Sequence, residues 1–241
     1  MAYDETVVLK DIDCAITPGQ VSAIMGPSGC GKSTLLRVLN RTLELIPRAR
    51  LVAGRVEFCG GDLYASGIRP SVIRRQIGLI NQRPVPFPAT ILDDVLFGAR
   101  YHGLIDGRTP VDYARDYLEQ VGLWKEVKHR LDDRAERLSG GQQQRLCLAR
   151  TLANQPEVIL MDEPCSSLDP AATKQIEELI FALKERYSIV IVTHNLAQAK
   201  RVCDRAIFML DGAIVEAGPR EQLFHEPRAK LTRDFISGEL G

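Results

Sequence analysis

The nine residues from Gly26 to Thr34, GPSGCGKST, constrain the possible folds of this 241-residue chain more than any other stretch. They match the pattern G-x-x-x-x-G-K-[ST], with Gly26, Gly31, Lys32 and Ser33 at the required positions. A short apolar run, VSAIM, comes before them, and a helical pattern from residue 32 to residue 43 follows. Such a loop wraps its backbone N–H groups around phosphate when a strand leads in and a helix leads out. The sequence therefore predicts a phosphate-binding loop, with Lys32 directed to the outer phosphates and Ser33 to Mg²⁺.

Strand-like and helical patterns alternate through most of the chain, which favours a mostly parallel α/β sheet. Residues 7–16 read as a strand, and residues 205–218 read as a hairpin around Asp211 and Gly212. In parallel sheets, ligands bind beyond the carboxyl ends of the strands. Five residues directly follow apolar strand-like runs and could therefore meet one ligand: Gly26, Gln82, Asp162, Glu163 and His194.

Two acids, Asp162 and Glu163, end the apolar run VILM. An acidic pair after a strand is often only a solvated turn, but a phosphate-binding loop in the same sheet favours a functional reading. Asp162 suits the Mg²⁺ shell, with contact through water because Mg²⁺ keeps several of its waters. Glu163 suits a base that polarises an attacking water.

Composition excludes several classes of function. The chain has 31 basic and 31 acidic residues, so a zero net charge gives no support to a nucleic-acid partner. No apolar run approaches the 18 or so residues of a membrane span, and the acidic N-terminus is unlike a signal peptide. The six cysteines lack C-x-x-C spacing, which is typical of reduced thiols in a cytosolic protein.

A second anion-binding feature lies far from the first. The stretch LSGGQ, residues 138–142, places a serine and two glycines directly before the helical run QQQRLCLARTLA. Backbone N–H groups at a helix N-terminus favour negative charge. One nucleotide does not require two such helix starts, so the pattern raises the question of which ligand the second one serves.

The ordered set of motifs resembles the ATP-binding subunits of ABC transporters over almost the whole chain. The set is GPSGCGKST (Walker A), Gln82 (Q-loop), LSGGQ (signature), VILMDEP (Walker B), SSLD (D-loop) and His194 (H-loop). This resemblance implies a single ABC ATPase domain over residues 1–241. Its P-loop NTPase (RecA-like) core and antiparallel β subdomain would occupy about 1–89 and 155–241, with an inserted α-helical subdomain at about 90–154.

The resemblance also implies a role for each motif, with ATP and Mg²⁺ as the bound groups. Catalysis would use Glu163, with His194 steadying it and Gln82 sensing the γ-phosphate. Residues implied to bind ATP are Tyr3, which stacks on adenine, and Gly26, Pro27, Ser28, Gly29, Cys30, Gly31, Lys32, Ser33 and Thr34. Residues implied to hold the metal are Ser33, Gln82 and Asp162. The D-loop comprises Ser167, Leu168 and Asp169. A surface tyrosine without a ligand is the alternative for Tyr3.

In this family two subunits pair head to tail, so the resemblance answers the question raised by LSGGQ. Signature residues of one chain would contact the ATP of the other: Ser139, Gly140, Gly141 and Gln142. The implied partners are a second copy of the chain, two transmembrane permease subunits and, through them, an extracytoplasmic binding protein. The subunit would lie at the cytoplasmic face of the inner membrane as a peripheral protein.

A narrower match, to the phosphate-import branch, lies in QRPVPFPATILDDVLFGARYHG. Its proline-rich part, Arg83 to Pro88, would dock on a permease helix with Phe87 as the apolar anchor, the alternative being a rigid loop. The chain departs from the family at four places. It begins two residues before Tyr3, which indicates a truncated or misassigned start. Cys165, Ser167 and Val85 replace the usual threonine, alanine and asparagine.

Three other functions remain open from the sequence. One is an importer of phosphonate, polar amino acids or another anion, which neighbouring permease genes would distinguish. Another is a soluble ABC ATPase in cluster assembly, translation or DNA repair, although proteins of the last two kinds often carry two cassettes or long insertions. The third is a nucleotide-binding regulator without turnover, with which Glu163 and His194 are poorly compatible.

Overall fold

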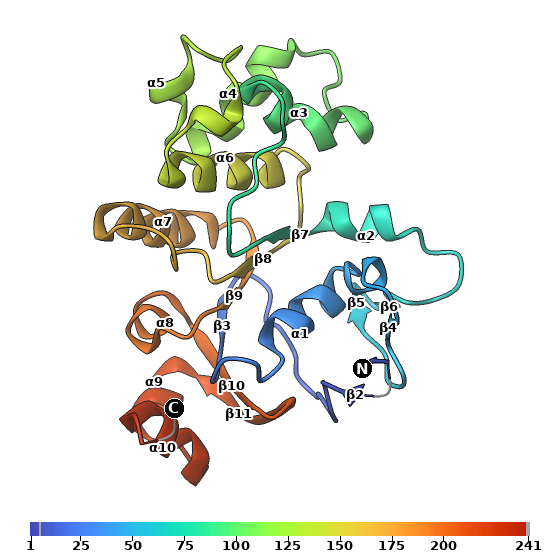
Figure 1. Ribbon diagram of the computed structural model, residues 1–241, viewed down its shortest axis with the longest axis vertical. Coiled ribbons are helices and arrows are strands. Elements are labelled where there is room, and N and C mark those ends of the chain that lie inside the picture. Colours follow the sequence, from blue (N-terminus) through green and yellow to red (C-terminus); the bar gives the residue numbers. More distant parts are fainter. Residues whose placement is uncertain (5, 240–241) are drawn as a thin grey trace.

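The computed structural model describes residues 1–4 and 6–239, and a six-stranded sheet runs through its centre (Figure 1). The strand order is β11-β10-β3-β9-β8-β7, and all neighbours are parallel except β10 and β11. The strands are β3 (Val21–Met25), β7 (Ile77–Ile80), β8 (Val158–Asp162), β9 (Ser188–Val192), β10 (Arg205–Leu210) and β11 (Ala213–Pro219). The predicted α/β sheet and the hairpin around Asp211 and Gly212 are both confirmed.

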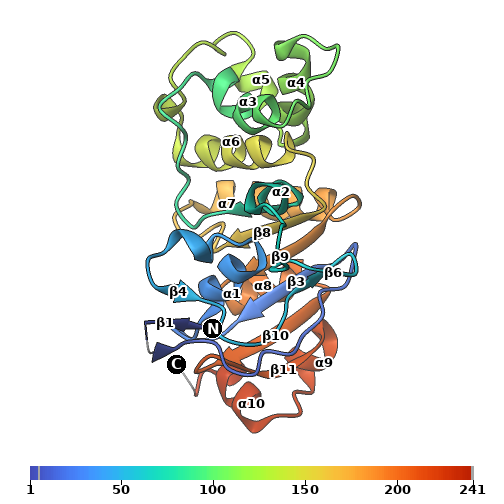
Figure 2. The same ribbon diagram turned by 90° about the vertical axis from the view of Figure 1, so that its right-hand side faces the viewer.

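Alternate residues of the central strands feed two separate cores. Val21 and Ile189 belong to one apolar cluster, whereas Ile24 and Val190 belong to the other. Because successive side chains of a strand point to opposite faces, each face needs its own covering layer. The helices α1 (Lys32–Leu39) and α2 (Pro70–Gln76) cover one face. The helices α7 (Pro170–Leu183) and α8 (Leu196–Val202) cover the other, as both views show (Figures 1 and 2).

Short antiparallel strands lie beside α1. One sheet has the order β2-β1-β4, and a separate hairpin joins β5 to β6. Their bounds are β1 (Ala2–Tyr3), β2 (Thr6–Val7), β4 (Ala49–Arg50), β5 (Glu57–Phe58) and β6 (Gly61–Asp62). The prediction of one strand over residues 7–16 is wrong beyond Val7. Asp11 has a φ of 45°, outside the extended region, and Lys10 hydrogen-bonds to Gly212 instead of a neighbouring strand.

The helix after the phosphate loop is shorter than the pattern predicts, ending at Leu39 instead of residue 43. Asn40 and Arg41 leave the helix, and Arg41 has a φ of 58°. The buried guanidinium of Arg41 then donates to the carbonyls of Leu63 and Ile68. Tertiary bonding to the neighbouring loop therefore outweighs the helical pattern. A 3₁₀ turn, η1 (Leu43–Leu45), follows.

Four helices gather at the end of the molecule farthest from the C-terminal helices (Figure 1). They are α3 (Ile91–Tyr101), α4 (Pro110–Gln120), α5 (Trp124–Val127) and α6 (Gly140–Leu152), with a 3₁₀ turn, η2 (Ala135–Arg137), before α6. The hydroxyls of Thr90, Thr109 and Ser139 cap α3, α4 and α6. Each capping residue directly precedes its helix, so local sequence sets these helix starts.

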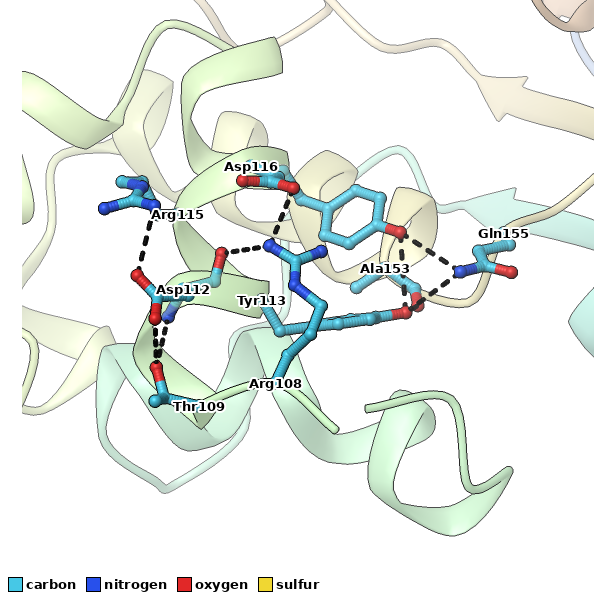
Figure 3. A network of polar contacts seen from close by, with 9 residues as sticks. Arg108, Thr109, Asp112, Tyr113, Arg115, Asp116, Ala153 and Gln155 are labelled. Carbon is cyan, nitrogen blue, oxygen red and sulfur yellow. Dashed lines mark hydrogen bonds and ion pairs between the residues drawn. The ribbon is translucent and has the colours of Figure 1, made fainter. Parts of the chain in front are cut away.

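A polar network ties α4 to the end of α6 (Figure 3). The hydroxyl of Tyr113 donates to the carbonyl of Ala153 at 2.8 Å, and Gln155 donates to the same hydroxyl at 3.4 Å. Arg108 pairs with Asp116 at 2.8 Å on the outer side of α4. The segment that leads from α6 into β8 is thereby held in place.

The C-terminal helices α9 (Arg220–His225) and α10 (Lys230–Ser237) close the far edge of the sheet. The ring of Phe235 stacks on that of Phe208, with 4.6 Å between the centroids. None of the helices within residues 1–4 and 6–239 combines the length and the apolar content needed to cross a bilayer.

Candidate nucleotide-binding site

The phosphate loop joins β3 to α1, and its backbone fits only glycine at the first turn. Gly26 has a φ of 152°, and a Cβ there would lie 2.1 Å from the carbonyl oxygen of Met209. Gly31 begins α1 with a φ of 104°. The ammonium of Lys32 lies inside the loop and donates to the carbonyls of Gly26 and Pro27 at 2.8 and 2.9 Å. The loop thus encloses the Lys32 ammonium within a backbone turn of the kind that binds phosphate through its N–H groups.

Two oxygen-bearing side chains meet beside this loop. Ser33 Oγ donates to Asp162 Oδ1 at 2.9 Å, joining the start of α1 to the end of β8. Burial raises the pKa of Asp162, and the hydrogen bond from Ser33 opposes that rise. A hydroxyl and a carboxylate are the ligand types that Mg²⁺ takes beside nucleotide phosphates, so this donor pair fits that ion.

Three strand ends bring Glu163, His194 and Gln82 together. Glu163 Oε1 lies 2.9 Å from His194 Nδ1, and Glu163 Oε2 accepts from Gln82 Nε2 at 3.1 Å. The backbone of Glu163 has a φ of 46°, in the left-handed region, and its N–H donates to the carbonyl of Val192 at 2.8 Å. Both carboxylate oxygens are thereby held by neighbouring side chains. The sequence singled out all three residues, but the unusual backbone of Glu163 leaves no signal in it.

Tyr3 lies next to the first turn of α1. Its hydroxyl is 3.4 Å from Thr34 Oγ1, and its ring packs partly against the core beneath β1. The predicted adenine-stacking residue is therefore adjacent to the phosphate loop.

The signature segment begins α6 and faces solvent. Ser139 and Gly140 are exposed. Ser139 N donates to Gln142 Oε1 at 2.9 Å while Gln142 N approaches Ser139 Oγ at 3.4 Å, a reciprocal cap. In both ribbon views α2, α7 and β8 lie between α6 and α1 (Figures 1 and 2). The signature and the phosphate loop of one chain are therefore at separate places.

Two residues that the sequence reading missed hold the signature in place. Glu126 accepts from Gln142 Nε2 at 2.8 Å and from Arg145 Nη1 at 2.8 Å. Arg145, which is 8% exposed, also donates to the carbonyl of Gly122. The hydrogen bond from Arg145 lowers the pKa of Glu126 and keeps it charged. The sequence does show that Gln142 and Arg145 are spaced to share one face of a helix. It gives no signal that their common partner is Glu126 on α5.

The D-loop leads from Walker B into α7. Asp169 caps α7 by accepting from Ala171 N and Ala172 N, each at 2.9 Å. Leu168 packs against the core, and Ser167 is exposed.

A groove of about 480 Å³ lies where the edge of the sheet meets α1, α3 and α6. Its lining includes Arg37, Asn81, Phe87, Phe97, Arg150 and Asn154. Phe87 is half-buried, and its ring lies 4.7 Å from that of Phe97 and 4.1 Å from the Arg150 guanidinium carbon. The predicted anchor is therefore already packed within the chain, although it still contributes to the groove.

Behind this groove, a buried ion pair holds the proline-rich loop. Asp94 is fully buried and lies 3.1 Å from Arg150 Nη1. Its Oδ2 atom also accepts from Phe87 N at 2.6 Å, and Arg150 donates to the carbonyl of Val85 at 3.2 Å. Arg150 stands in the last turn of α6, so the helix that starts with the signature ends at this loop.

Comparison with known proteins identifies the family of this chain. Residues 9–166 match the ABC transporter family. The chain is 46% identical over 239 residues to the phosphate import ATP-binding protein PstB of Desulfitobacterium hafniense, covering 99% of this chain and 92% of that protein. It is 45% identical over 239 residues to the phosphate import ATP-binding protein PstB of Thermotoga maritima, covering 99% and 95%. The chain belongs to the ABC transporter family, as one of its ATP-binding proteins.

Proposed function

We propose that this chain hydrolyses ATP to drive the import of inorganic phosphate through a membrane permease. The observation that carries the hydrolytic part is the contact of Glu163 with both His194 and Gln82, beside the phosphate loop. The similarity to two phosphate import proteins over nearly the full chain supports phosphate as the solute.

ATP would bind with its phosphates in the loop from Gly26 to Thr34. The loop amides and the Lys32 ammonium supply the positive partners, and Lys32 would exchange its carbonyl contacts for phosphate oxygens. Tyr3 would stack on adenine, because it lies beside Thr34. Mg²⁺ would be held by Ser33, Asp162 and Gln82, and it would neutralise charge on the β- and γ-phosphates.

Glu163 would act on the attacking water. Its carboxylate would accept a proton as the water oxygen bonds to the γ-phosphorus and the bond to the ADP oxygen breaks, giving ADP and inorganic phosphate. His194 holds one carboxylate oxygen at 2.9 Å and would contact the γ-phosphate. Gln82 holds the other carboxylate oxygen and would report the state of the site to the adjoining loop.

A second copy of the chain would complete each site. The exposed Ser139 and Gly140, with Gly141 and Gln142, would face the γ-phosphate bound by the other copy. The D-loop residues Ser167, Leu168 and Asp169 would lie near that interface. In this pairing, the N-terminus of α6 at the signature would have the γ-phosphate of the other copy's ATP as its ligand.

Each copy of the chain would dock one of the two permease subunits in the groove lined by Phe87 and Phe97. The exposed Phe97 offers apolar surface, and Arg37 and Arg150 border it with positive charge. We assign residues 90–154 to the helical subdomain that carries the signature. The subunit would sit as a peripheral protein at the cytoplasmic membrane face, and an extracytoplasmic phosphate-binding protein would deliver the solute.

The test combines isolation from membranes with uptake assays. The tagged chain is purified from membranes, its permease partners are identified, and uptake of labelled phosphate is measured in cells that lack the native subunit. We expect uptake to return with the chain and not with Lys32→Ala, which should abolish hydrolysis. Restored uptake of a phosphonate or an amino acid without phosphate would overturn the solute and leave the ATPase assignment intact.

A further inference from the structure

A buried hydroxyl stands directly before His194. Thr193 Oγ1 donates to Gln198 Oε1 at 2.9 Å, and both residues are 3% exposed. The same hydroxyl accepts from the backbone N–H of Asn195 at 3.0 Å. The Thr193 hydroxyl therefore links the residues on both sides of His194, and it is itself held by the Gln198 side chain of α8.

Cys165 stands two residues after Glu163, on the loop that leaves β8. Burial is the main influence on the pKa of its thiol, and a hydrogen bond from the Gln198 side chain opposes the effect of burial. Burial raises the pKa of Cys165 to about 11 in spite of this bond, so the sulfur is a neutral thiol at ordinary pH. The thiol side chain packs against the main core, which leaves it little freedom to move.

These contacts support the catalytic pair from the side of α8. They lead from Gln198 through Thr193 to His194, whose imidazole lies 2.9 Å from Glu163. The helix that bears Gln198 is itself fixed, because Arg201 forms two hydrogen bonds with Glu177 of α7 at 2.7 and 2.9 Å.

We propose that Gln198 is a positioning residue for ATP hydrolysis, holding the His194 loop where the imidazole meets the carboxylate of Glu163. The left-handed backbone of Glu163 persists only where its surroundings hold it, and Gln198 is part of that support. Within residues 1–4 and 6–239, Gln198 forms hydrogen bonds with Thr193 and Asn195, and neither of these lies in the phosphate loop. Its loss should therefore slow the chemical step and leave ATP binding unchanged. The inference rests on the roles proposed for Glu163 and His194 and is independent of the transported solute.

Three variants of the full-length subunit test the proposal. Gln198→Met keeps the length of the side chain but removes its amide, whereas Gln198→Glu keeps an acceptor for the Thr193 hydroxyl. Lys200→Met changes an exposed residue of the same helix. We expect Gln198→Met to lower kcat about ten-fold, as the loss of a buried hydrogen bond acting on the transition state would. KM and the affinity for ATP without Mg²⁺ should stay at wild-type values, Gln198→Glu should recover most of kcat, and Lys200→Met should match wild type.

A double-mutant cycle decides whether the effect passes through His194. In single-turnover measurements, Gln198→Met added to His194→Ala should cost far less than it costs alone, because the residue it positions is gone. If Gln198→Met does not fold, Thr193→Val removes the same hydrogen bond from the other side and should give the same loss of kcat.

The proposal is overturned if the two substitutions are fully additive, if ATP affinity falls as much as kcat, or if Gln198→Met is as active as wild type. Failure of the underlying roles would look different. Glu163→Gln and His194→Ala would then themselves retain turnover.

Discussion

At the scale of single residues, the site depends on backbone conformations that ordinary side chains rarely adopt. Gly26 turns the chain out of β3 against the carbonyl of Met209, and Glu163 turns it out of β8 with a φ of 46°. The first is achieved by a residue that lacks a Cβ, the second by contacts that hold a strained residue in place. The strained backbone of Glu163 sets the direction of its carboxylate, whereas the absence of a Cβ at Gly26 makes room for the carbonyl of Met209.

Two of the three phosphate-loop glycines, Gly26 and Gly29, should differ in their tolerance of a methyl group. Gly26→Ala should lower the free energy of unfolding by about 3 kcal/mol, because the Cβ would meet both a carbonyl and Cys30 Sγ. Gly29→Ala also has a positive φ, but nothing lies within 4 Å, so we expect a loss of about 1 kcal/mol. Urea denaturation of both variants measures the difference. Equal losses would mean that conformation alone, and not the close approach to Met209, sets the requirement for glycine at Gly26.

At the scale of elements, α6 joins the two surfaces through which we propose that the chain meets other chains. Its first turn presents Ser139, and its last turn places Arg150 between Asp94 and the carbonyl of Val85. One helix therefore carries residues of both surfaces.

Removing Arg150 should expose the cost of burying Asp94. Arg150→Met leaves a carboxylate without its ion-pair partner, and we expect a loss of about 3 kcal/mol in unfolding free energy at pH 8. Burial already raises the pKa of Asp94, and losing Arg150 should raise it further. Below the pKa that Asp94 has in the unfolded chain, Asp94 is protonated in both the folded and the unfolded state, and the cost of burying its charge vanishes. This cost grows as the pH rises from there through the pKa that Asp94 has in the folded chain. Denaturation at pH 5 and pH 8 should therefore show a smaller loss at pH 5, and Asp94→Asn in the same chain should remove this pH dependence.

The signature should loosen when its acceptor on α5 is removed. Glu126→Ala takes away the partner of Gln142 and should raise the ATP concentration needed for dimerisation of a hydrolysis-deficient Glu163→Gln chain, by about five-fold. The affinity of the monomer's own phosphate loop should not change. The exposed Glu119 provides the matched control, and an equal effect of Glu119→Ala would assign the result to net charge alone.

At the scale of the whole molecule, the phosphate loop and the signature of one chain do not meet. Sheet and helices separate them in both views, and the signature faces solvent (Figures 1 and 2). A site that needs both must therefore take them from two copies. ATP would then bind the assembled state in preference to the monomer and would shift the equilibrium toward it.

Blocking hydrolysis should make that assembly visible. Glu163→Gln removes the proposed base and leaves Lys32 and Ser33, so it should convert from monomer to dimer when ATP and Mg²⁺ are added. Adding Ser139→Arg should prevent dimerisation, because a bulky cation would fill the space of the partner's γ-phosphate. Light scattering with and without ATP distinguishes the states. A Glu163→Gln chain that stays monomeric at high protein and ATP concentration, or a double variant that still dimerises, would contradict the head-to-tail arrangement.

The sequence by itself determined the parallel sheet, the phosphate loop and the strand ends that carry Asp162, Glu163 and His194. These follow from local rules: buried strands read as apolar runs, and a loop that binds phosphate needs glycines and a lysine at defined spacing. Only the tertiary structure decided that the strand at residues 7–16 stops at Val7, since a carbonyl from the distant hairpin takes its hydrogen bond.

Sequence patterns also could not identify the residues that hold the functional side chains in place. Glu126, Asp94 and Gln198 act through partners between 5 and 56 positions away in the chain, on other helices and loops. Polar side chains of these types occur on any helix surface. Asp94 and Gln198 are distinguished by burial against a particular partner, whereas the exposed Glu126 is distinguished by its contacts with Gln142 and Arg145. Packing alone creates that burial, so local motifs located the chemistry while long-range contacts set its geometry.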